Sequence, residues 1–241
     1  MYANCAASYC TRVFAEGADS FEAMKDLAFF MIDTTIRQQN SQGYWPSTAV
    51  STWLLQDYRI GAGYYDTRFN SDFARILIAF YEQFGGDCIY DALSRYLDFY
   101  VLFVEQNAWE MFGGIVVPDY GYPGMITPHM ALNHELAEMQ VLYRASVRLN
   151  RPELEELADR LLTAIENSAY AWIAPDGNLH YGVFPDGRFG MWEYPYLTYN
   201  DLFEMQQLLE EKGRTRSPAL DRMMDSKRVW LDRNGITEYK K

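Results

Sequence analysis

Apolar residues recur at intervals of three and four along most of this chain, and this spacing constrains its fold more than any other feature. The first such run lies in residues 21–39, and its apolar positions include Phe21, Met24, Leu27, Ala28, Met31 and Ile32. One turn of an α-helix holds 3.6 residues, so this spacing places the apolar side chains on a single face. We therefore predict an amphipathic helix here, with Asp19 or Ser20 as its N-cap.

Six further runs form three pairs, each joined by a turn. Residues 70–85 pair with 87–106, residues 132–149 with 153–172, and residues 202–211 with 218–234. Gly85 and Gly86 are suited to end the first helix of the first pair, because glycine tolerates the backbone angles of a helix end. Pro152 is suited to start a helix, where its missing N–H costs nothing. The chain is therefore predicted to be all-α, a series of αα-hairpins.

An irregular repeat relates the hairpins. Asn70, Asn133 and Asn200 stand at or near the starts of the first helices, 63 and 67 residues apart. Asparagine at a helix start either caps free N–H groups or contacts a ligand, and the recurrence fits both roles. Hairpins that cannot bury their apolar faces alone close on one another. We expect one α/α-toroid domain over residues 1–241, as an incomplete ring or arc.

Long loops rich in glycine and aromatic residues precede these helices. They span residues 42–67, 113–128 and 175–197, and they contain Gly43-Tyr-Trp-Pro46, Tyr120-Gly-Tyr-Pro123 and Trp192-Glu-Tyr-Pro195. In a toroid such loops gather at one end. They would form a cleft lined by Tyr and Trp, whose flat faces suit sugar rings.

Composition excludes several classes of partner. The chain has 241 residues, 49% of them hydrophobic and 22% charged, as in one ordinary soluble domain. Its net charge of −12 argues against nucleic acid and anionic membranes, which need clustered Lys and Arg. No uncharged apolar run reaches the roughly 18 residues of a membrane span. Residues 1–10 lack the features of a secretory signal, so we expect a cytoplasmic protein.

Neither cysteines nor histidines suggest a metal or a cofactor. Cys5, Cys10 and Cys88 are too few for a disulfide framework and lack the spacing of a zinc site, and Cys88 is expected to be a buried core residue. His129 and His134 lie five apart rather than the four of a zinc helix. No nucleotide-binding motif occurs. We therefore expect no metal and no cofactor.

Three tyrosines are the strongest candidates for chemistry. They are Tyr122, Tyr181 and Tyr194, and two of the three stand just ahead of a predicted helix with asparagine near its start. A phenol there can donate or accept a proton. With a reference pKa of about 10, its phenolate is a stronger base than a carboxylate, but a cation or strong hydrogen bonds must help it form.

The order of these motifs resembles that in the C-terminal catalytic domain of the glucuronyl C5-epimerases of heparan sulfate and heparosan. The resemblance rests on Tyr122-Pro123, Leu132-Asn133, Tyr181, Trp192-Glu-Tyr194 and Asn200-Asp-Leu202, with support from Gly43-Tyr-Trp-Pro46 and the hairpin after Tyr65. It implies an α/α toroid that inverts a carbon next to a carboxylate. It also implies that Tyr194 carries a proton, while Tyr122 and Tyr181 orient the substrate or complete the relay.

This sequence departs from that family at three places. Gly121 replaces the acidic residue before Tyr122, Gly182 begins a segment without the family's Asp-x-Arg-His, and Pro195 replaces a histidine. These differences favour a smaller or different substrate, with proton abstraction and return next to a carboxylate or carbonyl. Side chains expected to bind it are Glu193, Asn133, Asn200, Arg68, Asp119, Trp192, Tyr65 and His180.

Two other functions fit the same fold. A lyase or glycoside hydrolase would need two carboxylates across the cleft, and Asp119 with Glu193 or Asp72 would supply them. A non-catalytic binding domain would explain the missing acidic residue before Tyr122. In each case we expect a small molecule or saccharide as ligand, and a homodimer would complete the arc.

Overall fold

The computed structural model describes residues 10, 13, 14, 17, 21–49 and 51–240. Its helices confirm the predicted hairpins. The elements are, in chain order, α2 (Glu22–Gln38), α3 (Thr52–Tyr58), β1 (Tyr65–Asp66), α4 (Thr67–Phe84), α5 (Asp87–Asn107), β2 (Trp109–Met111), β3 (Gly114–Val116), β4 (Tyr120–Gly121), β5 (Met130–Ala131), α6 (Leu132–Arg148), α7 (Pro152–Asn167), α8 (Ala169–Trp172), β6 (Gly182–Val183), β7 (Phe189–Gly190), α9 (Leu197–Glu211) and α10 (Pro218–Arg233).

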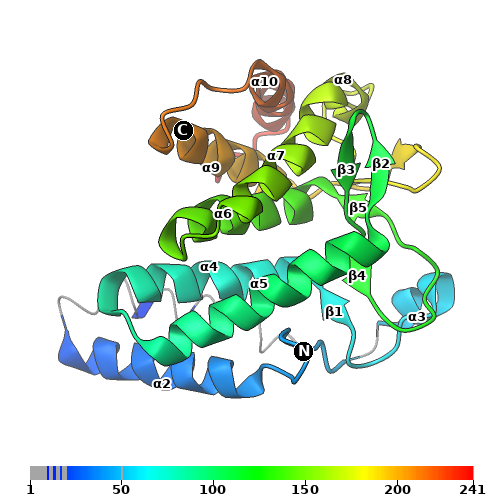
Figure 1. Cartoon of the computed structure of the whole chain (residues 1–241). Helices are drawn as coiled ribbons and strands as arrows, with labels where there is room; N and C mark the ends of the chain where they lie inside the picture. The colour runs from blue at the N-terminus through cyan, green and yellow to red at the C-terminus, as the bar shows by residue number, and fades with distance from the viewer. Residues whose placement is uncertain (1–9, 11–12, 15–16, 18–20, 50, 241) are drawn as a thin grey trace.

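The helices form two layers. The first helices of the hairpins, α4, α6 and α9, pack side by side, with α6 in the middle. Their partners α5, α7 and α10 form the second layer, and α5 and α7 run in similar directions across the front of the view (Figure 1). Helix α6 is buried along most of its length because α4, α7 and α9 all contact it.

Apolar side chains from both layers meet in one large core. Trp172, Tyr96, Tyr100 and Phe80 are among the largest fully buried side chains. Phe73, Leu77 and Phe80 lie on the buried face of α4 at the spacing that predicted this helix. The toroid class expected from the hairpins is confirmed by the comparisons reported below.

Short strands occupy the loops before the first helices. β1 pairs with β4, β2 with β3, and β5, β6 and β7 form a three-stranded sheet in that order, all antiparallel. In the β5–β6 pair Met130 lies opposite Val183. These strands and α3 were not predicted. Strands of two or three residues are too short to show an alternating pattern.

Several helix starts differ from the prediction. Helix α4 begins at Thr67 rather than at Asn70, because the Asp66 carboxylate caps it by accepting a 2.9 Å hydrogen bond from the Phe69 N–H. Asn70 is instead buried within the helix, where its amide bonds both the N–H and the carbonyl of Trp45. The N-cap role of asparagine is therefore wrong at all three repeats, since Ala131 and Tyr196 precede α6 and α9.

Smaller corrections concern the remaining helix ends and the cysteines. The predicted helix over 153–172 divides at Ser168 into α7 and α8, and α9 begins five residues before the predicted Leu202. Cys88 lies exposed near the start of α5 rather than in the core. Cys5, Asp19 and Ser20 lie outside the described residues. None of the described helices combines the length and apolar character needed to cross a bilayer.

Candidate active site

The starts of the first helices meet at one end of the molecule. Each hairpin reverses the chain, so α4, α6 and α9 all begin at the same end, near β1, β4 and β5 (Figure 1). Near these starts lie Thr67 and Arg68 of α4, His134 of α6 and Asp201 of α9. Residues far apart in the sequence therefore come together here.

Asp119 lies fully buried at the centre of this group. Its Oδ1 accepts a 2.7 Å hydrogen bond from the Ala131 N–H, so the start of α6 holds the carboxylate. Asp119 Oδ2 lies 3.2 Å from Nε2 of His129, and Oδ1 lies 3.6 Å from Nδ1 of His134. One carboxylate thus stands between two imidazoles.

A tyrosine contacts each imidazole on its other side. The Tyr58 hydroxyl lies 3.0 Å from His129 Nδ1, and the Tyr181 hydroxyl lies 3.4 Å from His134 Nε2. We name Tyr58, His129, Asp119, His134 and Tyr181 the Asp119 cluster. It contains two Tyr–His pairs that meet at one buried carboxylate.

The hydrogen bonds of Thr67 assign the tautomer of His134. The Thr67 hydroxyl donates its single proton to the Asp119 carbonyl at 3.1 Å, and it lies 2.8 Å from His134 Nδ1. With the Thr67 proton assigned to this carbonyl, Nδ1 carries the imidazole proton and donates it to Thr67. Nε2 then keeps its lone pair and accepts a hydrogen bond from the Tyr181 hydroxyl.

Burial keeps this pair neutral. It lowers the pKa of His134 to about 4, so the imidazole is uncharged at pH 7. Burial, reinforced by the negative charge of Asp119, raises the pKa of Tyr181 far above its ordinary value. Burial and the charge of Glu193 also raise the pKa of Tyr194. The tyrosines are therefore hydrogen-bond donors here, and the phenolate base expected from the sequence is disfavoured.

Glu193 supplies a buried carboxylate whose pKa lies near neutral pH. It is buried, its Oε1 accepts a 2.8 Å hydrogen bond from the Thr198 hydroxyl, and its Oε2 has no hydrogen-bond partner among the described residues. Burial raises the pKa of Glu193 to about 7. The next residue, Tyr194, meets the Tyr181 ring edge-on, so the loop that carries Glu193 lies beside the Asp119 cluster.

The loop carrying Glu193 is fixed by a buried lysine from α10. The Lys227 ammonium donates a 2.9 Å hydrogen bond to the Tyr194 carbonyl and a 2.5 Å hydrogen bond to Oδ1 of Asn178. Burial lowers the pKa of Lys227 to about 8. The positive charge of Lys227 in turn favours the ionised form of Glu193.

Arg68 is held by two aspartates and does not offer a free cation. Its Nη1 donates a 2.6 Å hydrogen bond to Asp201 and a 3.0 Å hydrogen bond to the Asn133 carbonyl, and its Nε lies 3.2 Å from Asp72. The charges of Asp201 and Asp72 together exceed the single positive charge of Arg68, so these three side chains carry a net negative charge. This group suits a neutral ligand better than a carboxylated one.

Partly exposed aromatic rings border the cluster. Trp53 stacks over His129 with ring centroids 6.1 Å apart and an interplanar angle of 27°. Tyr194 meets Tyr181 edge-on at 5.7 Å. Trp53 is 40% exposed and Tyr194 is 51% exposed. Exposed faces of this kind can stack on a sugar ring.

The structure brings six of the predicted site residues together. They are Tyr181, Tyr194, Glu193, Asp119, Arg68 and Asn133. Sequence reasoning missed Tyr58, Thr67, His129 and His134 as parts of this group. The two histidines were weighed only as metal ligands, although the start of a helix after an aromatic loop is the signal that singled out the tyrosines. Tyr58 ends α3, which was not predicted.

Five other predicted residues lie elsewhere. Tyr65 is buried in the core, where its hydroxyl donates to Glu138. Tyr122 packs against a separate apolar cluster around Leu54, Ile60, Tyr64 and Tyr120. The Asn200 amide accepts a hydrogen bond from the Lys240 N–H. Trp192 is 91% exposed, and the backbone N–H of His180 bonds the Trp172 carbonyl.

No metal site is evident in the part of the chain that the structure describes. Although Asp119, His129 and His134 are neighbours, no group of three or more His, Cys, Asp or Glu side chains there is arranged to hold an ion. The described side chains of the Asp119 cluster instead form hydrogen bonds with one another, with the Thr67 hydroxyl and with the Ala131 N–H.

Comparisons with known proteins define the class of fold. A D-mannose isomerase matches with a TM-score of 0.64 and 14% identity over 91% of this chain and 58% of its own. The cellobiose 2-epimerase of Spirochaeta thermophila matches at 0.61 and 15% identity over 95% and 59%, respectively. A family 76 glycoside hydrolase, a mannosidase of Bacteroides thetaiotaomicron, matches at 0.58 and 12% identity over 94% and 58%. The chain has the α/α-toroid fold of these enzymes.

The same comparisons limit what the likeness shows. The chain spans a little under three fifths of the length of these solved structures. No family model and no curated protein matches its sequence. The comparisons confirm the α/α-toroid fold that the resemblance implied, and they give no support for the glucuronyl C5-epimerase family itself.

Proposed function

We propose that the Asp119 cluster and Glu193 move a proton at a carbon next to the carbonyl of a neutral, open-chain sugar, as in an isomerase or epimerase. The observation that carries this proposal is the neutral Tyr181–His134 pair beside a carboxylate whose pKa is about 7. Such a reaction needs a base for a weakly acidic C–H and a donor for the carbonyl oxygen.

Each group then has one role. Ionised Glu193 takes the proton from the carbon, and the C–H electron pair forms a C=C bond as the carbonyl π electrons move to oxygen. With substrate bound, the Tyr181 hydroxyl turns its single proton from His134 Nε2 to that oxygen, and this hydrogen bond stabilises the developing charge. In an isomerisation the proton of the neighbouring hydroxyl passes to this first oxygen, and protonated Glu193 gives its proton to the carbon that had carried the carbonyl, so that the new carbonyl forms at the neighbouring carbon. An epimer would form only if a second acid gave a proton to the opposite face of the same carbon, while Glu193 kept the proton that it had taken.

A neutral sugar fits the site better than a uronate. Arg68 is balanced by Asp201 and Asp72, so it offers no free charge to a substrate carboxylate. Asp119 and Glu193 would repel one. The mannose isomerase and the cellobiose epimerase that share the fold are named for neutral sugars, which supports this choice. The uronate chemistry implied by the sequence resemblance is replaced here by chemistry next to a carbonyl.

The test is conversion of neutral aldoses and ketoses, followed by NMR, with uronates as a parallel panel. We expect interconversion of a neutral sugar, lost in Glu193→Gln and reduced roughly 10²-fold to 10³-fold in kcat by Tyr181→Phe, since that donor acts mainly in the transition state. Tyr143→Phe, which alters a tyrosine that bonds Asp159 instead, is the matched control. Turnover of uronates alone would contradict the proposal.

A second candidate is glycoside hydrolysis. Buried Glu193, with its pKa near 7 and its unpartnered Oε2, has the properties of a general acid, and the mannosidase shares the fold. A hydrolase would release reducing ends from a glycoside. In that case the sugar product would carry no new C–H bond.

A further inference from the structure

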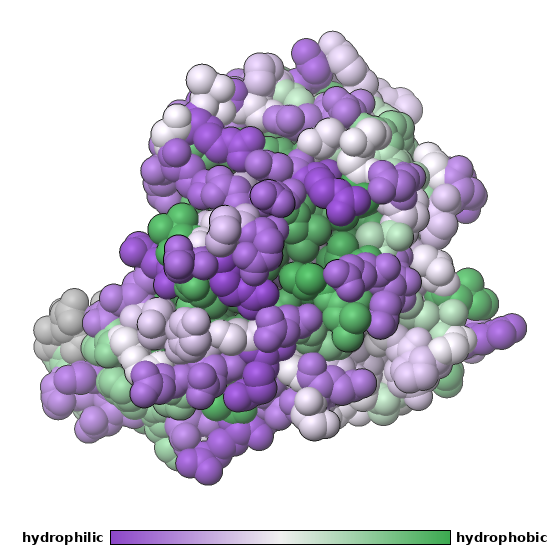
Figure 2. Space-filling view, in the orientation of Figure 1, coloured by the Kyte–Doolittle hydropathy of each residue, from purple (hydrophilic) through white to green (hydrophobic). Residues whose placement is uncertain are grey.

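A groove separates α5 from α7, away from the Asp119 cluster. Its cavity volume is about 470 Å³, and none of its lining residues belongs to that cluster. Figure 2 shows it as a hollow with an apolar floor and polar borders near the middle of the view. The hairpin β2–β3 closes one side, with Ile115 on the floor.

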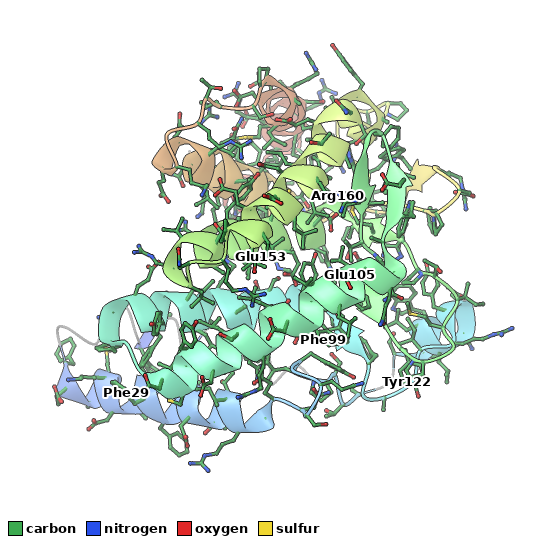
Figure 3. The ribbon with its side chains drawn as sticks, in the orientation of Figure 1. Phe29, Phe99, Glu105, Tyr122, Glu153 and Arg160 are labelled. Carbon is green, nitrogen blue, oxygen red and sulfur yellow. The ribbon has the colours of Figure 1, made fainter. Side chains whose placement is uncertain are left out.

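Two helical stripes line this groove. On α5 and its C-cap the lining residues are Val101, Val104, Glu105 and Ala108, and on α7 they are Glu153, Glu156, Leu157 and Arg160. Both sets follow the spacing i, i+3, i+4, i+7, which marks one face of a helix over two turns. Figure 3 shows Glu105 on one side of the hollow and Glu153 and Arg160 on the other.

Close packing holds the walls in place. Gly114 of β3 lies so near α7 that a Cβ atom there would come within 2.3 Å of the Arg160 carbonyl oxygen and 2.6 Å of the Ala164 nitrogen. The Arg160 guanidinium lies 3.3 Å from Glu110 on β2. The groove is therefore formed before any ligand arrives, which lowers the entropic cost of binding.

The charge on the groove is negative. Four glutamates and one arginine line it. Glu153 pairs with Arg151 and Glu110 with Arg160, whereas Glu105 and Glu156 form no ion pair with any described residue. Two carboxylates, one on each helix, are thus left facing an apolar floor of Val104, Ile115 and Leu157.

We propose that this groove docks a short basic amphipathic helix of a partner protein. Two stripes over seven residues span about 10 Å, which matches two turns of a third helix. Apolar side chains of that helix would cover Val104 and Leu157, as in helix-in-groove recognition. Its lysines or arginines would pair with Glu105 and Glu156, and this charge complementarity selects a basic partner rather than an acidic one.

The test uses designed peptides of 14 residues with leucines at i, i+3, i+4 and i+7. One carries lysines on its flanks, one carries glutamates, and one is a scrambled form of the lysine peptide. Fluorescence anisotropy measures binding to the full chain. We expect only the lysine peptide to bind. The substitution Ala108→Arg, which fills the groove, should weaken the affinity for this peptide about tenfold or more. Val229→Arg on exposed α10 is the control and should bind as the unchanged protein does.

Charge reversal separates docking from general attraction to an acidic protein. Glu105→Lys with Glu156→Lys should transfer preference from the lysine peptide to the glutamate peptide. The same number of reversals at Asp91 and Glu211, exposed and away from the groove, should not. Equal binding of the scrambled peptide, or no effect of Ala108→Arg, would overturn the proposal. So would self-association of the chain that Ala108→Arg abolishes, because a second copy would then be the occupant.

Discussion

Burial decides the protonation states of the side chains around Asp119. His134 and Tyr181 are each shifted toward the uncharged form, and their hydrogen bond needs no ion pair. Burial raises the pKa of Glu193 to about 7, near the pH at which a carboxylate can both take and return a proton. Enolisation requires a neutral hydrogen-bond donor for the carbonyl oxygen and a base for the C–H proton. The Tyr181–His134 pair and Glu193 have these properties.

The pH dependence of turnover should follow Glu193. Its pKa is about 7, and it must be ionised to act as a base. We therefore expect kcat/KM to rise with pH through about 7 and to level above it, while His134 stays neutral throughout. A pH profile measured by NMR checks this. A flat profile between about pH 6 and 8 would show that Glu193 is not the base.

A second buried carboxyl, Glu138, should make stability fall as the pH rises. Tyr65 and Tyr96 both donate hydrogen bonds to its Oε1, and burial raises its pKa to about 8 in the folded protein. Because the folded pKa lies above the unfolded value, the folded state binds the extra proton. This stabilisation is complete below about pH 4.5 and is lost as the pH rises through about 8.

Glu138→Gln should remove that contribution. Each proton taken up on folding gives a slope of about 1.4 kcal/mol per pH unit, so the variant should flatten the fall in unfolding free energy between about pH 5 and 8. Urea denaturation at several pH values measures it. Glu211→Gln, at a partly exposed ion pair, is the control. An unchanged slope in Glu138→Gln would mean that another group titrates.

At the residue scale, the structure brings about half of the predicted residues together in the candidate site, and their roles stay predictions. Tyr181, Tyr194 and Glu193 were found because unusual aromatic motifs precede helices. His134 and Thr67 were not, because their roles depend on the start of α4 meeting the start of α6, a contact between segments 67 residues apart. Tyr65 was wrongly predicted to bind substrate because its position in a loop does not show that its side chain is buried in the core.

Among the elements, the long helices were predictable and the short ones were not. A run such as α4 repeats its apolar spacing over four turns, whereas α3 has seven residues and β1 has two. The starts of α4 and α9 were placed too late because polar side chains near both helix starts bond groups of the candidate site rather than continue an apolar stripe. Thr67 and Arg68 do so in α4, and Thr198 and Asp201 do so in α9.

The contact between β3 and α7 gives a prediction for these elements. Gly114→Ala should force the hairpin β2–β3 away from α7 and cost about 1–3 kcal/mol of unfolding free energy, because both neighbouring atoms belong to the backbone. Gly190→Ala in β7 meets only the Phe184 ring at 3.8 Å and should cost less than about 0.5 kcal/mol. Chemical denaturation compares them, and equal effects would contradict the packing argument.

For the whole molecule, the hairpin repeat and the aromatic loops predicted the architecture. Local helix periodicity indicates which segments pair, and antiparallel pairing places the starts of the first helices at one end. The choice of substrate depended on charges that only the assembled structure brings together, above all Arg68 with Asp201 and Asp72. The homodimer expected from the sequence stays a prediction.

The most direct measurement is incubation in deuterium oxide with neutral aldoses and ketoses, followed by NMR of the carbons next to the carbonyl. We expect deuterium at that carbon with the unchanged protein and none with Glu193→Gln, when circular dichroism shows the same helix content in both. Isotope incorporation that persists in Glu193→Gln would contradict the assigned base. Binding of a sugar with neither isotope incorporation nor conversion to another sugar would contradict proton transfer itself.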